Sequence, residues 1–173
     1  FHLPLAGSTF KKVYYDQLLG RAVSKFIPAE DLIVPYTATS LDDAEAIIHS
    51  LKVSENDLRK QQVNGFYSDV ELGPPGVDNN DELTKKEREL SGTKKTGRQE
   101  PVYTVLECHV NLDLEGFEDV DGENQPTGIK LPYIVTVEEG SRKILSIRRN
   151  YAPNDLKKNK IQYFVHFKFL PGL

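Results

Sequence analysis

The feature that most constrains the fold is a period-two alternation of side chains through the C-terminal part of the chain. Residues 102–114, 129–138 and 161–169 alternate in this way, and 143–151 forms a further short run. Consecutive strand residues point to opposite faces of a sheet, so these runs predict strands with one buried face and one wetter face. A tight turn at 138–141 joins two of the runs as a hairpin. We therefore expect an antiparallel sheet of four or more strands.

The alternation also predicts which side chains face the core. In the first run Cys108 and Val110 belong to the more apolar set, while Glu107 and His109 belong to the other set. We expect Cys108 to behave as a small hydrophobe with a raised pKa and not as a nucleophile, because His109 points to the opposite face. His109 and His166 are both expected on the wetter face. They meet only if their strands pair, and two histidines alone do not make a metal site.

Two helices are predicted before residue 65. Ser40 is placed to cap a helix over 41–51, and Ser54 is placed to cap a second helix. Asp57 follows Ser54 at the spacing of a capping box, and Asn64-Gly65 supplies a stop signal. The apolar stripe of the first helix consists of Leu41, Ala44, Ile48 and Leu51.

The N-terminal segment predicts short extended pieces separated by turns. Residues 1–5 and 9–15 are interpreted as a loose hairpin, and 22–27 and 32–36 as two further extended pieces. Pro28 and Pro35 restrict these two pieces to the edges or ends of strands.

The whole chain, 1–173, is interpreted as a single α+β domain with two or three short helices covering the apolar face of the sheet. Residues 74–100 form a polar excursion, expected to be mobile, in which 83–90 is predicted as a short solvated helix. Residues 115–128 are predicted to form an acidic loop.

Composition agrees with a globular domain and excludes several classes of protein. The chain is 38% hydrophobic and 28% charged, with a net charge of −4, which excludes collagen-like, coiled-coil and wholly disordered chains. Its single cysteine forms no internal disulfide, and no apolar run approaches the roughly 18 residues of a membrane span, so no membrane partner is expected. There is no methionine and both ends are apolar. We therefore expect a domain cut from a longer protein.

Motifs for nucleotide and calcium binding are incomplete. Residues 92–99 have the glycine spacing of a phosphate loop but lack its lysine and its magnesium-binding hydroxyl. Residues 111–116 copy the opening of a calcium loop, but Gly122 occupies the position of the bidentate glutamate. We predict no catalytic residue, no cofactor-binding residue and no metal ligand.

Charge is distributed unevenly along the chain. Residues 107–123 contain seven acids and no lysine or arginine, whereas 142–160 contain seven bases and one acid. One interpretation is a polarised surface that docks against a second copy or meets a polyanion. The alternative is that the two segments are neighbours within one sheet and neutralise each other.

Several stretches of the chain resemble the portal proteins of tailed bacteriophages. The stretches are FHLPLAGS (1–8), KKVYYD (11–16), IPAEDLIVPY (27–36), PYIVT (132–136), ILSIRRNY (144–151) and FKFLPGL (167–173). The resemblance covers most of the chain apart from residues 74–100 and the acidic loop.

The resemblance implies a structural, non-enzymatic piece of a ring subunit, corresponding to the wing-like body of the portal. Portal rings usually contain twelve copies, stand at one vertex of the virion and are assembled in the bacterial cytoplasm. DNA passes through them during packaging and ejection, and capsid, terminase and tail proteins dock onto them. The family leaves ATP hydrolysis to the terminase, so the resemblance carries over no catalytic residue.

Two other functions remain open from the residues alone. The first is a cytoplasmic metal-dependent hydrolase domain that uses the acidic loop together with His109 or His166. The second is a non-viral binding module that presents the acidic loop to a basic partner.

Overall fold

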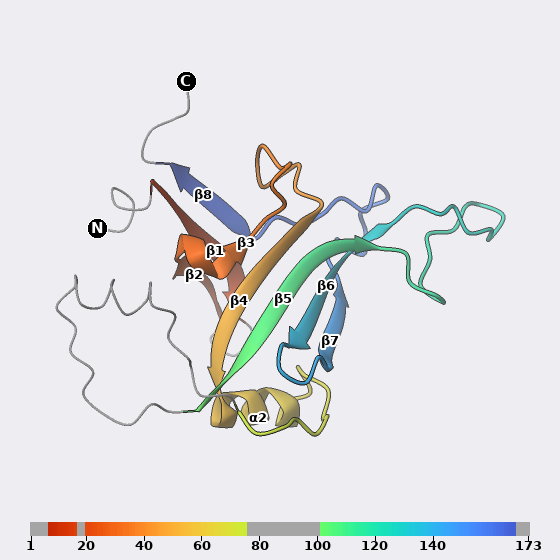
Figure 1. The fold of residues 1–173 in the computed structure, drawn as a ribbon. Helices are drawn as coiled ribbons and strands as arrows, with labels where there is room; N and C mark the ends of the chain where they lie inside the picture. The colour runs from red at the N-terminus through yellow and green to blue at the C-terminus, as the bar shows by residue number, and fades with distance from the viewer. Residues whose placement is uncertain (1–6, 17–19, 76–100, 169–173) are drawn as a thin grey trace.

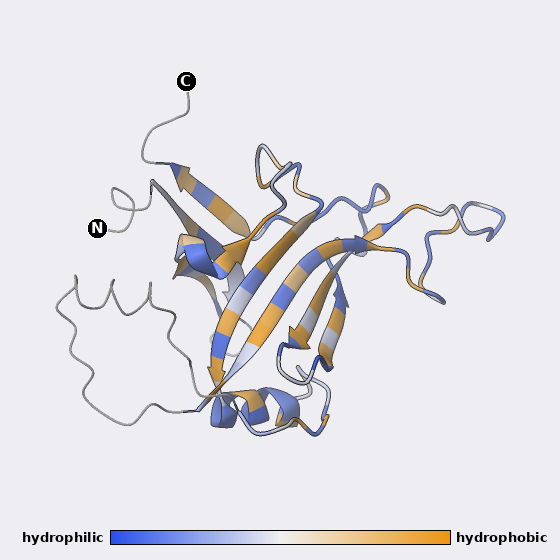
Figure 2. Cartoon of the chain, in the orientation of Figure 1, coloured by the Kyte–Doolittle hydropathy of each residue, from blue (hydrophilic) through white to orange (hydrophobic). Residues whose placement is uncertain are grey.

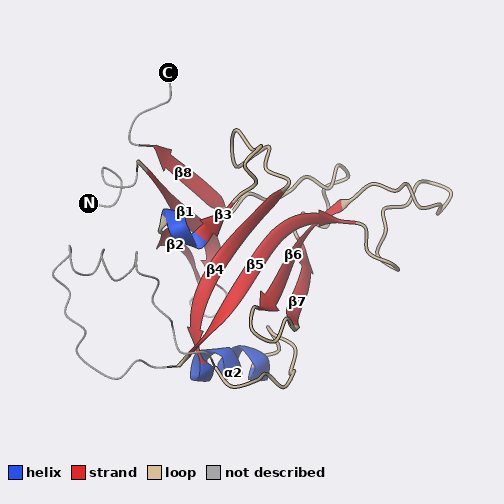
Figure 3. Ribbon diagram, viewed as in Figure 1, coloured by secondary structure: helices blue, strands red, loops and turns tan. Residues whose placement is uncertain are grey.

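The structure is a computed structural model that describes residues 7–16, 20–75 and 101–168. It contains two antiparallel sheets, one α-helix and one 3-10 turn, so it is a sheet-dominated α+β fold (Figures 1 and 3). The smaller sheet has the strand order β2-β1-β8 and the larger has the order β3-β4-β5-β6-β7. The elements are β1 (Ser8–Asp16), β2 (Arg21–Ile27), η1 (Ala29–Asp31), β3 (Leu32–Ile33), β4 (Ala46–Ser54), α2 (Glu55–Val63), β5 (Val102–Leu112), β6 (Leu131–Glu138), β7 (Ile144–Arg149) and β8 (Phe164–Lys168).

The predicted antiparallel sheet is confirmed, but the set of strands that form it differs from the prediction. β5, β6 and β7 are consecutive neighbours, and the turn between β6 and β7 closes as predicted. The Glu138 carboxylate holds that turn by accepting hydrogen bonds from the amides of Gly140 and Ser141, at 2.9 and 2.6 Å. The last alternating run does not join this sheet. Its strand β8 pairs instead with β1, with Ser8 opposite Lys168.

The helix predicted over 41–51 is wrong. The Asp43 carboxylate accepts hydrogen bonds from the Ser40 amide at 2.8 Å and the Thr39 amide at 3.2 Å, and these bonds close a turn. The chain then enters β4, in which Ile47 and His49 are buried and Ile48 is only half-buried. Branched side chains pack well on a pleated sheet, and β4 obtains backbone partners on both sides from β3 and β5.

The second predicted helix is confirmed as α2. The Ser54 hydroxyl caps it by accepting a hydrogen bond from the Asp57 amide at 3.2 Å. The helix ends at Val63 with Asn64 as its C-cap, and Gly65 takes a φ of 72°, which is the left-handed conformation that glycine adopts without strain. Leu58 points from α2 into the core.

The prediction of which strand faces are buried is wrong. In β5 the buried set is Tyr103, Val105, Glu107 and His109, while Cys108 and its set are half-buried. In β8 Phe164 is 2% exposed, whereas Val165 is 44% exposed. Figure 2 shows hydrophobic and hydrophilic bands along the strands. The buried set contains apolar residues such as Val105 and Phe164, and the less buried set also contains apolar residues such as Val165. The layer that packs against each strand therefore decides which set is buried.

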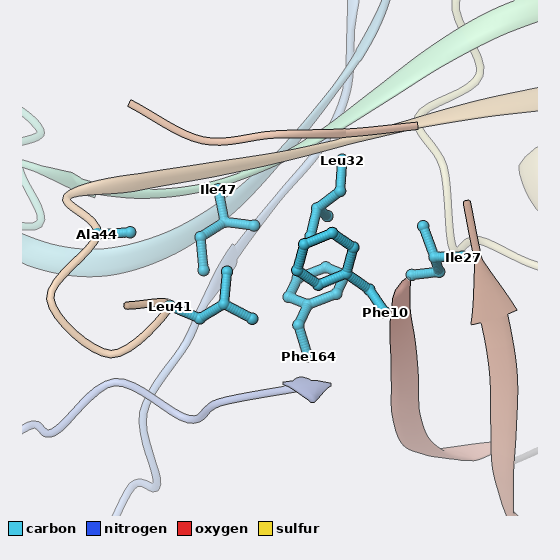
Figure 4. Packing of buried hydrophobic residues seen from close by; sticks show 7 residues of the cluster. All are labelled: Phe10, Ile27, Leu32, Leu41, Ala44, Ile47 and Phe164. Atoms are coloured by element: carbon cyan, nitrogen blue, oxygen red, sulfur yellow. The ribbon is translucent and has the colours of Figure 1, made fainter. Parts of the chain in front are cut away.

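The core has two parts, and both lie on the same face of the five-stranded sheet. The first lies between the two sheets, where the side chains drawn in Figure 4 point toward one another: Phe10, Ile27, Leu32, Leu41, Ala44, Ile47 and Phe164. The second lies under α2 and the segment that follows it: Leu58, Tyr67, Tyr103, Val105 and Leu145. The helices were expected to cover the sheet, but α2 covers only one end, and the three-stranded sheet packs against β3, β4 and β5 (Figure 1).

The N-terminal predictions are met in part. Residues 9–15 and 22–27 lie in strands, and they pair with each other as β1 and β2. Of the piece at 32–36, only Leu32–Ile33 is a strand. Residues 1–5, the polar stretch beyond residue 75 with its predicted helix at 83–90, and the phosphate-loop-like segment at 92–99 lie outside the described residues. Within the described residues, no helix is long and apolar enough to cross a membrane.

Candidate functional site

A cluster of charged side chains lies in the middle of the face shared by the two sheets. The Lys12 Nζ atom lies 2.6 Å from Oε1 and 2.7 Å from Oε2 of Glu107. The His109 Nε2 atom lies 2.7 Å from the same Oε1. The side chains of Lys12, Glu107 and His109 are 14%, 11% and 2% exposed. We call these three residues the Lys–Glu–His cluster.

The period of the strands places these residues together. Glu107 and His109 are two residues apart in β5, so they project from the same face. Lys12 comes from β1, where it lies on the same face as Phe10, the residue that points into the core between the sheets. The cluster therefore joins β1 of one sheet to β5 of the other.

A polar row crosses the five-stranded sheet at the level of Glu107. His49, Glu107, Thr136 and Ser146 are direct cross-strand neighbours from β4 to β7. His49 and Thr136 are buried, at 7% and 1% exposed. His49 Nδ1 and Ser146 Oγ have no hydrogen-bond partner among the described residues. Such buried orphan atoms are unusual and are commonly satisfied by ordered water.

Aromatic rings cover the histidines of this face. The His109 ring meets the rings of Phe164 and Tyr163 edge-on, with centroid distances of 4.9 and 5.6 Å. The His49 ring also meets Phe164 edge-on, at 5.9 Å. The Lys12 Nζ atom lies 5.9 Å from the centroid of the Phe164 ring. Phe164 therefore forms an apolar cover over the charged groups, which weakens their contact with water.

The environment shifts the pKa values of the buried groups. Burial alone would raise the pKa of Glu107, but the hydrogen bond from His109 and the charge of Lys12 outweigh burial and lower the pKa to about 2. Burial, with the charge of Lys12 as a smaller cause, lowers the pKa of His49 to about 4. At neutral pH Glu107 is thus an anion that accepts hydrogen bonds, and His49 is a neutral imidazole.

This electrostatic state determines what the cluster can do. A carboxyl group with a pKa near 2 is a poor general acid or base near neutral pH, because proton transfer is most effective when the pKa is close to the working pH. An ionised Glu107 whose two oxygens are engaged by Lys12 and His109 is a structural contact. The arrangement therefore serves to hold the two sheets in one orientation.

The histidines proposed for a metal-dependent function are held apart. His109 is bound to Glu107, and its predicted position on the wetter face is wrong because the three-stranded sheet covers it. The His166 ring stacks on Phe10 with a centroid distance of 4.6 Å, and its Nε2 atom lies 3.0 Å from the Ser8 hydroxyl. Their strands β5 and β8 lie in different sheets, so the pairing that would have brought the two rings together does not form.

Cys108 is placed as the alternation predicted relative to His109, on the opposite face of β5. It is half-buried, and its burial and the nearby charge of Glu107 raise the pKa of the thiol. The predicted raised pKa is confirmed. The thiol is uncharged near neutral pH, because its pKa lies above the usual range.

The acidic loop holds its own carboxylates. Asp121 accepts hydrogen bonds from the amides of Glu123 and Gln125, both at 2.9 Å. Asp119 accepts a hydrogen bond from the Thr127 hydroxyl at 2.7 Å and is also bound by Lys158. In the described part of the chain, no group of three or more His, Cys, Asp or Glu side chains is placed to hold a metal ion.

The two charged segments neutralise each other only in part. The contact of Lys158 with Asp119 joins the basic segment 142–160 to the acidic segment 107–123. Glu107 pairs instead with Lys12, which belongs to neither of these segments. The sequence patterns did not single out Lys12. The feature that could have identified Lys12 was its position in an alternating strand, where Phe10, Lys12 and Tyr14 share one face.

Comparison with models of known protein families gives no match, and comparison with curated proteins gives none either.

Proposed function

We propose that this chain is part of the wing-like α+β body of a portal protein subunit from a tailed bacteriophage. In this role it is a structural, non-enzymatic piece of a ring, usually of twelve copies, at one vertex of the virion. The ring conducts DNA during packaging and ejection and binds capsid, terminase and tail proteins. Its assembly takes place in the cytoplasm of the bacterial host.

The observation that carries the proposal is the set of portal-like stretches and their position in the fold. KKVYYD lies in β1, PYIVT lies in β6 and ILSIRRNY spans β7. IPAEDLIVPY runs from the end of β2 through η1 and β3. These stretches therefore supply strands to both sheets, and the resemblance concerns the framework of the domain and not a single surface motif.

The interior supports a mechanical role. The Lys–Glu–His cluster engages both oxygens of the buried carboxylate and ties the two sheets together. β1 and β8 are neighbours, with Ser8 opposite Lys168. This pairing places Phe10 of β1 and Phe164 of β8 together in the core between the sheets.

Electron microscopy of the full-length parent protein tests the proposal. We expect rings with a central hole, and we expect the gene to lie beside terminase and capsid genes. A parent protein that remains monomeric in a phage-infected lysate would contradict the proposal.

A further inference from the structure

The outer face of the three-stranded sheet is apolar and is exposed. Its inner side chains Phe10 and Phe164 pack against the five-stranded sheet. On the opposite side Val13, Tyr15, Val165 and Phe167 are between 40% and 64% exposed. Lys11 lies among them, directly opposite Val165. We call these five residues the outer patch.

Among the residues that the structure describes, the positive charge of the outer patch has no acidic counterpart. The Lys11 Nζ atom lies 5.5 Å from the centroid of the Phe167 ring, a cation–π contact. The residues of β1 that share its side are Thr9, Val13 and Tyr15, and none is acidic. No carboxylate among the described residues pairs with Lys11. An apolar surface with one central cation favours a partner that is apolar and acidic.

A segment with that chemistry projects from the other end of the molecule. Residues 113–129, which we call the arm, carry six acids and no base. The arm also exposes Phe117, Val120 and Ile129, at 58%, 46% and 58%. In Figure 1 the arm extends away from the sheets on the side opposite to β1, β2 and β8. The arm of one molecule therefore does not reach its own outer patch.

The arm is preformed. Within it, the Thr127 amide donates to the Asp119 carbonyl at 2.8 Å and the Asp121 amide donates to the Gln125 carbonyl at 3.0 Å. The Tyr133 hydroxyl donates to the Phe117 carbonyl at 3.1 Å and attaches the arm to β6. A preformed segment loses little conformational entropy on binding.

We propose that the arm of one copy docks on the outer patch of a second copy. The exposed Phe117 and Val120 meet the apolar side chains of the patch, and acids of the arm such as Glu115 approach Lys11. Because the arm and the patch are different surfaces, the contact is head-to-tail and repeats from copy to copy. This inference rests on the proposed function, since a head-to-tail contact of suitable geometry closes into a ring.

Complementation between two variants of the 173-residue chain tests the contact. The patch variant carries Lys11→Gln and Tyr15→Ser, and the arm variant carries Glu115→Gln and Phe117→Ser. In sedimentation velocity we expect the unchanged chain to associate as its concentration rises and each variant alone to associate at least about tenfold more weakly. In an equimolar mixture, the intact arm of the patch variant should bind the intact patch of the arm variant and form a 1:1 complex. This complex should not grow further, because its two remaining surfaces are the substituted ones.

Controls separate lost contact from lost folding. Tyr36 is fully exposed and lies outside both surfaces, so Tyr36→Ser should associate like the unchanged chain. Circular dichroism melting should give all variants a cooperative transition. High salt should weaken the association, because exposed charges are screened.

Three results would overturn the inference. They are an unchanged chain that stays monomeric up to about 1 mM, variants that associate as well as the unchanged chain, and a mixture that forms no 1:1 complex. Failure here is separate from failure of the portal proposal. Rings of the parent protein that form normally with both variants would overturn only the arm contact, whereas a 1:1 complex without rings would overturn only the portal proposal.

Discussion

Lys12 of β1 and Glu107 of β5 are 95 residues apart in the sequence, yet Lys12 Nζ lies within 2.7 Å of both carboxylate oxygens. The two residues belong to different sheets, so their ion pair is a contact between layers. It is covered by Phe164 and shared with His109. A charge in such an environment is costly to leave unpaired.

Removing one partner of this pair should strongly destabilise the domain. Lys12→Met keeps most of the side-chain length and leaves Glu107 without its cation, so we expect a loss of about 3–5 kcal/mol in the free energy of unfolding. Urea denaturation followed by circular dichroism measures this change. The double variant Lys12→Met/Glu107→Gln should recover part of the loss, since no buried charge is left unpaired. A loss below about 1 kcal/mol for Lys12→Met, the size expected of a surface pair, would contradict this interpretation.

Stability should fall in two steps as pH is lowered. The pKa of His49 is about 4 in the folded protein and 6.5 as its ordinary value, so unfolding takes up a proton between these values. The stability that neutral His49 contributes is present above pH 6.5 and is lost as pH falls toward 4. The pKa of Glu107 is about 2 in the folded protein and 4.5 as its ordinary value. The stability that ionised Glu107 contributes is therefore present above pH 4.5 and is lost as pH falls toward 2.

Variants assign the two steps. His49→Gln should remove most of the upper step, and Glu107→Gln should reduce the lower one, each measured as the free energy of unfolding against pH. The pKa of His166 is also lowered by burial, so His166→Gln is the comparison variant and should remove a smaller part of the upper step. If His166→Gln and not His49→Gln removed the upper step, the assignment to His49 would be incorrect.

The cap of α2 predicts a small, local effect. Ser54→Ala removes the hydroxyl that accepts from the Asp57 amide, and we expect a loss of about 1 kcal/mol in the free energy of unfolding. Ser54→Asp should be nearly neutral, because aspartate is an equally good cap. Equal losses for the alanine and aspartate variants would indicate that packing at residue 54, and not the cap, is responsible.

The arm should bind divalent cations only weakly. The carboxylates of Asp119 and Asp121 are already occupied by groups of the protein, so a cation would have to displace those hydrogen bonds. Titration calorimetry with calcium, magnesium, manganese and zinc should show no stoichiometric binding tighter than about 10 µM. Tighter binding with one ion per chain would instead favour the metal-dependent hydrolase hypothesis.

Elements whose signals lie close together in the sequence were predictable, whereas elements whose partners are distant in the sequence were not. α2 was predictable because its cap, its stop and its single buried face all lie within residues 54–65. The structure of segment 41–51 was not predictable, because two patterns overlap there. Leu41, Ala44, Ile48 and Leu51 fit the spacing of a helix, while the alternate residues from Ile47 to Val53 fit a strand. A short apolar run of this kind is ambiguous until its neighbours are known. The pairing of β4 with β3 and β5 resolved the ambiguity.

The site was predictable only in part. The sequence placed Glu107 and His109 on one face of a strand and Cys108 on the other, because strand geometry alone requires it. It did not show that β8 pairs with β1, a contact between opposite ends of the chain. Without that pairing there was no reason to expect Phe164 over His109 or Lys12 against Glu107.

The sequence by itself therefore determined the strand periods, the second helix, the β6–β7 hairpin and the unequal distribution of charge. Each depends on residues close together in the chain, where backbone geometry and capping act directly. Only the tertiary structure decided which faces became interior and which charges met, because burial depends on the layer that packs against a strand. In this protein that layer is built from β1 and β8, the first and last strands that the structure describes.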